Sequence, residues 1–273
     1  MQHCSTSPKE IVASFWRNRG LIWQMSKREV IGRYRGSVMG LAWSFFNPIL
    51  MLAVYTFVFS VVFKARWGVV SEDSKAGFAI ILFVGMIVHG LFAECVNRAP
   101  GLILSNVNYV KKVVFPLEIL PWIAMGSALF HAVISLAVLL IAQVIVNFSL
   151  PWTVVLFPLV ILPLLITTMG VAWLLSATGV FVRDIGQTTG IITTVLLFLS
   201  PVFYPVSALP KEYQGWLLLN PLTFVIEEVR KVLIGGKIPD WGGWGISFLA
   251  SLTIAWAGFW WFQKTRRGFS DVI

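Results

Sequence analysis

Few residues in this chain are placed to do covalent chemistry. The four aspartates are isolated from one another and the three histidines lie far apart (Asp73, Asp184, Asp240 and Asp271; His3, His89 and His131). Enzymes that act on sugars use paired carboxylates, and metal sites use clustered histidine, cysteine or carboxylate ligands. The sequence also has no P-loop, H-E-x-x-H or G-x-S-x-G pattern. We therefore expect no catalytic residue, no metal and no cofactor in this chain.

One acid and one base lie at the edge of a long apolar run. Glu94 and Arg98 are one helical turn apart, and ionisable residues within membrane spans are functional candidates by default. We interpret these two residues as an ion pair at a membrane interface. We expect His89 and His131, which also lie in apolar surroundings, to be hydrogen-bonded packing residues.

The elements that carry these residues are strongly apolar. The chain has 273 residues, of which 58% are hydrophobic and only 12% are charged. A soluble domain has about 25% charged residues, so this chain lacks the polar surface that a water-soluble globule needs. The composition therefore indicates a membrane protein.

Charge-free windows locate the membrane spans. A spanning helix needs about 20 mostly apolar residues. The longest window, 119–182, has room for two helices, and the turn-forming stretch NFSLPW at 147–152 divides it. The windows predict an all-α polytopic membrane protein with six transmembrane helices, over 38–62, 78–98, 118–146, 152–181, 186–203 and 243–263. We expect a single transmembrane domain over 1–273.

Basic residues predict the orientation of the spans. Lysine and arginine are in excess in segment 1–35, in the loop after the second span and in the C-terminal tail. Loop 64–77 and segment 204–240 carry little net charge. Because basic residues near span ends stay in the cytoplasm, both termini are predicted to be cytoplasmic. The net charge of +9 is then mostly a topology signal, and nucleic acid is not an expected partner.

The first 35 residues mix aromatic and basic side chains, including Trp16, Trp23, Arg33 and Arg35. This composition predicts a helix in the plane of the membrane interface, with membrane lipids as partners. A solvated basic leader is the alternative. The pattern does not predict a signal peptide, because it lacks a short apolar core with a small-residue cleavage site.

Two G-x-x-x-G patterns stand at the starts of predicted spans, as Gly36 with Gly40 and Gly186 with Gly190. Small residues at this spacing let helix backbones approach closely in lipid. The pattern also arises easily by chance, so it favours a helix contact at these glycines only modestly.

The segment between the last two spans, 204–240, is rich in proline and in apolar residues. It predicts two short helices that form a re-entrant hairpin, which requires cover by protein or by a watery cavity. An ordinary surface loop that contains a helix is the alternative. Glu227 and Lys231 are spaced i, i+4, and Glu228 and Lys231 are spaced i, i+3 on a neighbouring line. These spacings predict an ion pair on a charged face directed to outer water.

Several stretches in order along the chain resemble one family. They are RYRGSVMGLAWSFFNP (33–48), NVNYVKKVVFPLEILP (106–121), FVRDIGQ (181–187), SPVFYP (200–205), LLNPLTFVIEEVRKVLIGG (218–236) and RRGFSDVI (266–273). The chain is similar in these to the membrane subunit of type-2 ATP-binding-cassette exporters of lipid-linked polysaccharide, such as O antigen. The resemblance covers nearly the whole chain, and it is much less specific about the glycan.

The resemblance implies a homodimeric permease in the bacterial inner membrane, bound to two copies of a separate ATPase subunit that takes Mg-ATP. It implies that a short helix after span 2 docks on that ATPase, with Asn106, Val107, Tyr109, Val110, Lys111 and Lys112 as the coupling residues. The valines there can form an apolar edge that Pro116 ends. A plain basic loop, the alternative, does not account for that edge.

The resemblance also implies a path and an outer gate. Span 1 would line the path through Tyr34, Trp43, Phe45 and Phe46, whose aromatic faces suit a sliding sugar polymer. Pro48 would kink the span, and Asn47 would either satisfy a carbonyl freed by Pro48 or face a polar lumen. Enrichment of aromatic residues at any membrane interface is the alternative. The outer gate would contain Tyr204, Pro205, Asn220, Pro221, Glu227 and Arg230. Exporters of capsule, teichoic acid or small molecules, and a membrane glycosyltransferase, remain alternative functions.

Overall fold

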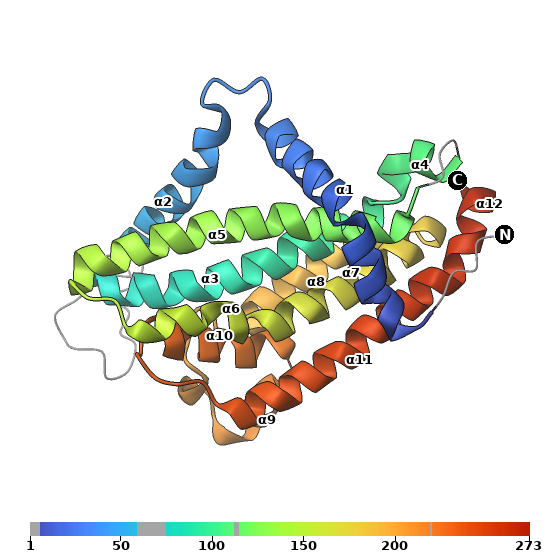
Figure 1. Cartoon of the computed structure of the whole chain (residues 1–273). Helices are drawn as coiled ribbons and strands as arrows, with labels where there is room; N and C mark the ends of the chain where they lie inside the picture. The colour runs from blue at the N-terminus through green and yellow to red at the C-terminus, as the bar shows by residue number, and fades with distance from the viewer. Residues whose placement is uncertain (1–5, 59–74, 112–114, 219) are drawn as a thin grey trace.

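The computed structural model describes residues 6–58, 75–111, 115–218 and 220–273 (Figure 1). Every regular element in these ranges is helical, as predicted. The longer helices are α1 (Pro8–Tyr34), α2 (Trp43–Tyr55), α3 (Lys75–Arg98), α5 (Leu120–Asn147), α7 (Leu162–Phe181), α8 (Ile185–Leu199), α10 (Pro221–Leu233) and α11 (Trp241–Thr265). The shorter helices are α4 (Val107–Lys111), α6 (Phe157–Val160), α9 (Lys211–Leu218) and α12 (Phe269–Val272).

Five helical stretches in the described residues are long and apolar enough to cross a membrane. They are Gly40–Val58, Gly77–Gly101, Leu117–Asn147, Trp152–Phe181 and Trp241–Val272. The chain is therefore an all-α polytopic membrane protein, and these five agree with five of the six predicted spans.

The predicted span 186–203 differs from the structure, because it is the shorter helix α8 of 15 residues. Ser200 has extended backbone angles and ends the helix, and Pro201 follows it. A residue before proline is driven out of the helical region. At about 1.5 Å per residue, α8 reaches only about 22 Å, so the chain turns back before it completes a full span.

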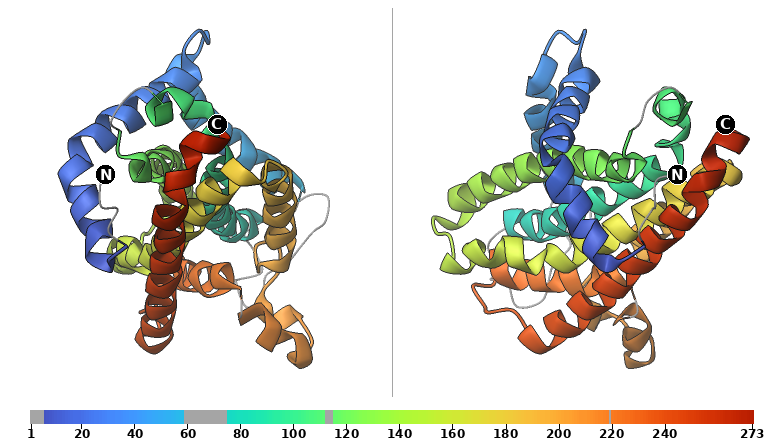
Figure 2. Two further views of the ribbon diagram at one scale, coloured as in Figure 1. Left: turned by 90° about the vertical axis from the view of Figure 1, so that its right-hand side faces the viewer. Right: turned by 45° about the vertical axis from the view of Figure 1, so that its right-hand side comes forward.

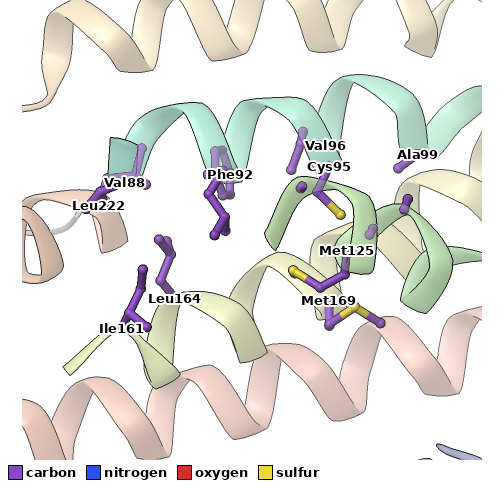
Figure 3. Close-up of a cluster of buried hydrophobic side chains, with 14 of the residues drawn as sticks. Val88, Phe92, Cys95, Val96, Ala99, Met125, Ile161, Leu164, Met169 and Leu222 are labelled. Atoms are coloured by element: carbon purple, nitrogen blue, oxygen red, sulfur yellow. The ribbon is translucent and has the colours of Figure 1, made fainter. Parts of the chain in front are cut away.

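The core is built around α3, which packs against α5, α7, α8 and α10. Figure 3 shows how Val88, Phe92 and Val96 of α3 face side chains from α5, α7 and α10. Leu222 at the start of α10 is completely buried in this cluster. Burial of an apolar side chain of this size stabilises the fold by about 1.5–3 kcal/mol.

Among the described glycines, the tightest contact joins α7 and α11 and does not involve the predicted glycine pairs. A Cβ atom at Gly258 would overlap the carbonyl oxygen of Gly170. Small residues allow such approach in lipid, but these two glycines belong to no G-x-x-x-G pattern, so the sequence pattern does not find them.

The G-x-x-x-G glycines have other surroundings in this chain. Gly36 and Gly40 lie in the turn between α1 and α2 with φ of 86° and 52°, so their spacing is not helical and the reasoning from helix packing does not apply. Glycine is needed there because other residues seldom adopt positive φ. A Cβ at Gly190 would meet no atom within 4 Å, and one at Gly186 would only touch the Pro100 side chain at 4.0 Å.

The N-terminal helix predicted within 1–35 is α1, which arches along one side of the bundle (Figure 2). Its buried side chains are Ser14, Ile22, Ser26 and Val30. Trp16 and Trp23 point outward and are 64% and 72% exposed. Helix α4, the start of α1 and the C-terminal α12 lie at one end of the bundle, while the connection from α5 to α6 lies at the other (Figure 1).

The segment 204–240 forms the two predicted short helices, α9 and α10. Its charged residues are arranged differently from the prediction, because α10 packs into the core against α3, α6 and α7. Glu228 and Arg230 are only 2% and 7% exposed. In place of the predicted Glu227–Lys231 pair, Glu227 pairs with Arg230, while Glu228 pairs with Lys231 at the predicted i, i+3 spacing. Glu228 and Arg230 are buried, Glu227 is half-exposed and Lys231 is exposed, so only part of the charged face is directed to water.

Candidate translocation path

Helix α3 is the most buried of the five spans, yet one line of its residues is open. In its central window 78% of the residues are buried, compared with 11% in the span that contains α2. The residues from 77 onward that are not buried share one face at helical spacing, and we call them the α3 stripe: Met86, Gly90, Ala93, Glu94, Asn97 and Arg98. A buried helix thus has one partly polar face that the described part of the chain covers less completely than the rest.

Helix α8 borders the stripe on one side. The His89 ring contacts the Thr193 carbonyl through Nε2 at 2.9 Å, and the Thr193 hydroxyl donates to Asn97 Oδ1 at 3.0 Å. Thr189 and Thr193 are the buried residues of α8, whereas its apolar side chains such as Ile191 point outward. His89 is therefore the hydrogen-bonded packing residue that we expected.

Helix α2 borders the stripe on the other side, where a cavity of about 200 Å³ lies between α2, α3 and α5. Its polar lining comprises Asn47, Glu94, His131 and Ser135, together with the ring of Tyr55. Gly90 lines the cavity, and a Cβ atom there would meet nothing within 4 Å. Space and hydrogen-bonding groups therefore occur together where Asn47 was predicted to face a polar lumen.

The polar end of this cavity is a charge cluster formed by three helices. Arg33 Nη1 lies 2.7 Å from Glu94 Oε1, and His131 Nδ1 lies 3.0 Å from the same carboxylate. The Tyr34 hydroxyl is 3.0 Å from His131 Nε2. Burial raises the pKa of Tyr34, so its hydroxyl remains neutral. Four side chains from α1, α3 and α5 thus hold one another in place.

This cluster corrects the predicted Glu94–Arg98 pair. Glu94 pairs with Arg33 and His131, while Arg98 pairs with Glu29 of α1. The pairing differs because the end of α1 folds over α3 and α5, and a separation of 61 residues gives no local signal. His131 is hydrogen-bonded as expected, but it belongs to a charged cluster rather than to an apolar core.

The aromatic residues predicted for the path begin α2. Trp43 and Phe46 pack edge to face with ring centroids 5.5 Å apart, and Trp43, Phe45 and Phe46 are 40–51% exposed. The structure places them along the helix that borders the cavity. Nothing in the described part of the chain covers their outer surfaces fully, so their contact with a substrate stays a prediction.

Most of the predicted coupling residues belong to α4 itself, Asn106 directly precedes it, and Lys112 lies outside the described residues. The Asn106 side chain donates to the Leu102 carbonyl at 2.8 Å. Tyr109 stacks on Phe115 with centroids 4.4 Å apart, and both pack against the core together with Val110. Part of the predicted apolar edge therefore faces the chain's own core, while Val107 is half-buried and Lys111 is exposed.

A buried carboxylate connects this region to the bundle. Glu118 accepts hydrogen bonds from Arg266 at 2.6 Å and from Ser14 of α1 at 3.1 Å. Arg266 also donates to the Phe115 carbonyl at 3.1 Å, and the Trp173 indole donates to the Glu118 carbonyl at 3.0 Å. Sequence reasoning missed Glu118, because its partners are about 55–150 residues away along the chain.

The predicted gate residues hold the end of α8 against α3 and α10. Arg230 donates to the carbonyls of Ile81, Pro201 and Val202 at 2.5–3.1 Å. Burial lowers the pKa of Arg230 to about 10, so the guanidinium stays charged at neutral pH.

Other residues predicted for the gate hold the turn that follows α8. Asn220 caps α10, where Pro221 is the first residue, and its amide donates to the Ser200 hydroxyl at 2.9 Å. Tyr204 directly precedes Pro205, and its hydroxyl donates to the Phe198 carbonyl at 2.9 Å. The segment predicted to be the gate is therefore fixed by several hydrogen bonds at the end of α8.

Four residues of the stripe, Met86, Gly90, Ala93 and Asn97, were not predicted. For Gly90 and Asn97 a signal is present, since Gly90, Glu94 and Asn97 interrupt an apolar helix at spacings of four and three. Within the described residues no group of three or more His, Cys, Asp or Glu could hold a metal ion.

The comparisons with known proteins agree with a membrane transporter of this kind. The model of the ABC-2 type transporter family matches residues 20–234. The chain belongs to the ABC-2 type transporter membrane family.

Individual relatives match over nearly their full lengths. The chain is 29% identical to the O-antigen export system permease protein RfbA of Myxococcus xanthus, over 96% of this chain and 99% of that protein. It is 22% identical to RfbA of Klebsiella pneumoniae, over 93% and 95%. It is also 24% identical to the polysialic acid transport protein KpsM of Escherichia coli, over 83% and 85%.

Proposed function

We propose that this chain is the permease subunit of an ATP-driven exporter that moves lipid-linked polysaccharide, O antigen in the first place, across the bacterial inner membrane. The main support is the similarity to the two RfbA permeases over more than nine-tenths of the chain. The α3 stripe supplies a possible wall of the path, because it exposes polar groups where a transmembrane helix is otherwise buried. Groups that accept and donate hydrogen bonds suit sugar hydroxyls.

The path would lie between two copies of this chain. Helices α2 and α8 border the stripe and expose apolar side chains such as Phe46, Ile191 and Phe198, which lipid or a second copy can cover. Homodimerisation would place two stripes face to face around one polar passage. Gly186, which is exposed, and Gly190, which is half-buried, then become available on α8 for contact with the partner copy.

The energy source would be a separate ATPase subunit that binds Mg-ATP. Helix α4 is a short element at the end of the bundle that also holds α12 (Figure 1), and the basic residues of the tail lie beside it. The positive-inside rule favours the cytoplasm for this end. An ATPase that grips α4 can drive transport only if it favours one conformation of the permease over another.

A second candidate function is export of capsule polysaccharide. The relatives include KpsM and the capsule polysaccharide export inner-membrane protein CtrC of Neisseria meningitidis, at 24% and 25% identity over 83% and 82% of this chain. Their lower coverage favours O antigen as the first candidate.

The proposal is tested by complementation in source cells that lack the gene. The wild-type chain should restore polysaccharide to the cell surface, while its absence should leave the polymer inside.

Gly90→Trp should block export, because it fills the cavity without meeting neighbouring atoms at Cβ, whereas Gly20→Trp on the open side of α1 should export normally. Full export with Gly90→Trp would exclude the stripe as the path, and unchanged surface polysaccharide in the deletion strain would exclude polysaccharide export altogether. A missing capsule with intact O antigen would establish the second candidate.

A further inference from the structure

Helix α1 consists of two halves that meet the bundle differently. Its second half packs directly, since Ile22, Ser26 and Val30 are buried and the Ser26 hydroxyl contacts the Ile123 carbonyl at 3.3 Å. A Cβ atom at Gly126 would collide with the Ser26 side chain. The first half stands away from the bundle and touches it chiefly through Ser14 and through Phe15, whose ring lies 4.7 Å from Trp122.

Beneath this first half lies a second cavity, of about 590 Å³. Four helices contribute its walls: Ile11 and Phe15 from α1, Trp122 and Leu129 from α5, residues such as Leu165 from α7, and residues such as Trp256 from α11. Thr253 is the one lining residue with a side-chain hydroxyl, and the walls are otherwise almost entirely apolar. This space is distinct from the α3 stripe and from the cavity beside it.

Water does not suit such a space. A buried water needs two to four polar partners, and apolar cavities without them stay dry. An empty cavity is also costly, because its lining loses van der Waals contacts on one side. In a membrane protein the abundant apolar material at hand is lipid, and a hydrocarbon chain can enter between α1 and α11, where Val12 and Trp256 are 67% and 47% exposed.

Two basic residues lie on α1 and α11 just outside the lining of this cavity. Trp256, Trp260 and Lys264 follow one another at intervals of four on α11, and the Lys264 ammonium lies 4.7 Å from the Trp260 ring centroid. Lys9 stands on α1 beside Pro8, which lines the cavity. Both lysines are exposed and have no acidic partner among the described ion pairs. Basic side chains above an apolar groove fit an anionic headgroup above a hydrocarbon chain.

We propose that this cavity is a binding site for an anionic phospholipid. One acyl chain fills the space under α1, and the phosphate lies between Lys264 and Lys9. The lipid thereby holds the first half of α1 at a set distance from α5, α7 and α11, where direct packing is missing. Occupancy of the site supports the Ser14–Glu118 contact, which joins α1 to the region of α4.

The test uses purified full-length permease in vesicles of phosphatidylglycerol and phosphatidylcholine mixed in equal amounts, with native mass spectrometry of the protein released from them. We expect the wild-type chain to retain phosphatidylglycerol preferentially. Leu129→Trp fills the cavity and should lower retention about tenfold, the effect of losing about two buried methylene groups. The matched control, Ile141→Trp, changes an exposed position of the same helix outside the cavity and should retain lipid like the wild type.

A second variant tests the headgroup separately. Lys9→Gln with Lys264→Gln should abolish the preference for phosphatidylglycerol, while Lys237→Gln, at an exposed lysine far along the chain, should keep it. Thermal unfolding of each variant identifies any that fail to fold, and the Lys variants, which bury nothing new, keep the test valid if Leu129→Trp is unstable. Equal retention by wild type and Leu129→Trp would overturn the proposal. Retention only after addition of a polyprenyl phosphate would also overturn it, because the site would then belong to the lipid carrier of a substrate.

Discussion

At the scale of single residues, glycines have different structural roles at different positions of this chain. Gly90 opens a cavity, Gly36 and Gly40 permit a turn, and Gly170 and Gly258 let two helices touch. The same residue type therefore serves three purposes, and only its neighbours in space distinguish them.

Gly258→Ala tests the closest of these approaches. The added methyl group would overlap the Gly170 carbonyl oxygen, so α7 and α11 must separate, which should destabilise the protein by about 1–3 kcal/mol. Gly20→Ala is the matched control, since its Cβ meets nothing within 4 Å, and in a helix interior it should stabilise by about 0.5–1 kcal/mol. Thermal unfolding in detergent measures both, and a Gly258→Ala protein as stable as the wild type would refute the tight contact.

At the scale of elements, the short helix α4 is linked to three of the long helices. Helix α4 is joined through Phe115, Arg266 and Glu118 to α1, α7 and α11. A displacement of α4 would therefore reach three long helices through hydrogen bonds to one buried residue, Glu118, whose carboxylate accepts from Ser14 and Arg266 and whose backbone carbonyl accepts from Trp173.

Substitution within α4 tests its proposed role in docking the ATPase. Val110→Asp should weaken co-purification with the ATPase subunit, because docking would bury an unpaired charge. Val110 also packs against the permease core, so Val107→Asp is needed as a second variant that does not disturb that packing. Ser105→Asp, at an exposed residue before α4, should bind like the wild type. Full co-purification of both valine variants would exclude α4 as the docking element.

Substitution of Arg230 tests the predicted outer gate. Arg230→Gln removes its bonds to the carbonyls of Ile81, Pro201 and Val202, and loss of charged hydrogen bonds of this kind costs about 1.5–3 kcal/mol. We expect a lower unfolding temperature and ion leak through the permease in liposomes without substrate. Lys237→Gln, at an exposed lysine after α10, is the control. Liposomes that stay as tight with Arg230→Gln as with the wild type would show that this turn does not close the path.

At the scale of the whole molecule, the arrangement separates two ends of a bundle. One end gathers α4, the start of α1 and α12, and the other holds the α5–α6 connection (Figure 1). Between them, α2 and α8 border an open face of α3. A membrane transporter needs this division into two sides and a face on which polar groups can meet a substrate.

Topology can be tested by labelling single cysteines in a background without Cys4 and Cys95. A cysteine at position 237 should react with an impermeant reagent applied outside sealed cells, because segment 204–240 carries little net charge and is predicted to be external. A cysteine at position 268 should react only after the cells are opened. Labelling of position 268 in sealed cells would reverse the orientation.

Much of the architecture could be predicted from charge spacing alone. Five of the six predicted spans agree with helices of spanning length, since the apolar length of a span is a local property. The length of the remaining predicted span, 186–203, was overestimated, because the apolar stretch continues past Ser200 and Pro201, where the backbone turns. The burial of the charged residues Glu228 and Arg230 on α10 was missed as well, because the carbonyls that receive Arg230 lie elsewhere in the chain and leave no local signal.

The amino-acid sequence by itself therefore determined that this is a membrane protein, where most of its helices lie along the chain, and which family it belongs to. These follow from composition, from charge-free length and from motifs that are continuous along the chain. Tertiary structure alone decided that Glu94 pairs with Arg33 and His131, that Glu118 joins α1 to the tail, and that Gly170 meets Gly258. The physical reason is that ion pairs and close contacts depend on distances in space, and residues 37–148 positions apart can meet only after the helices have packed.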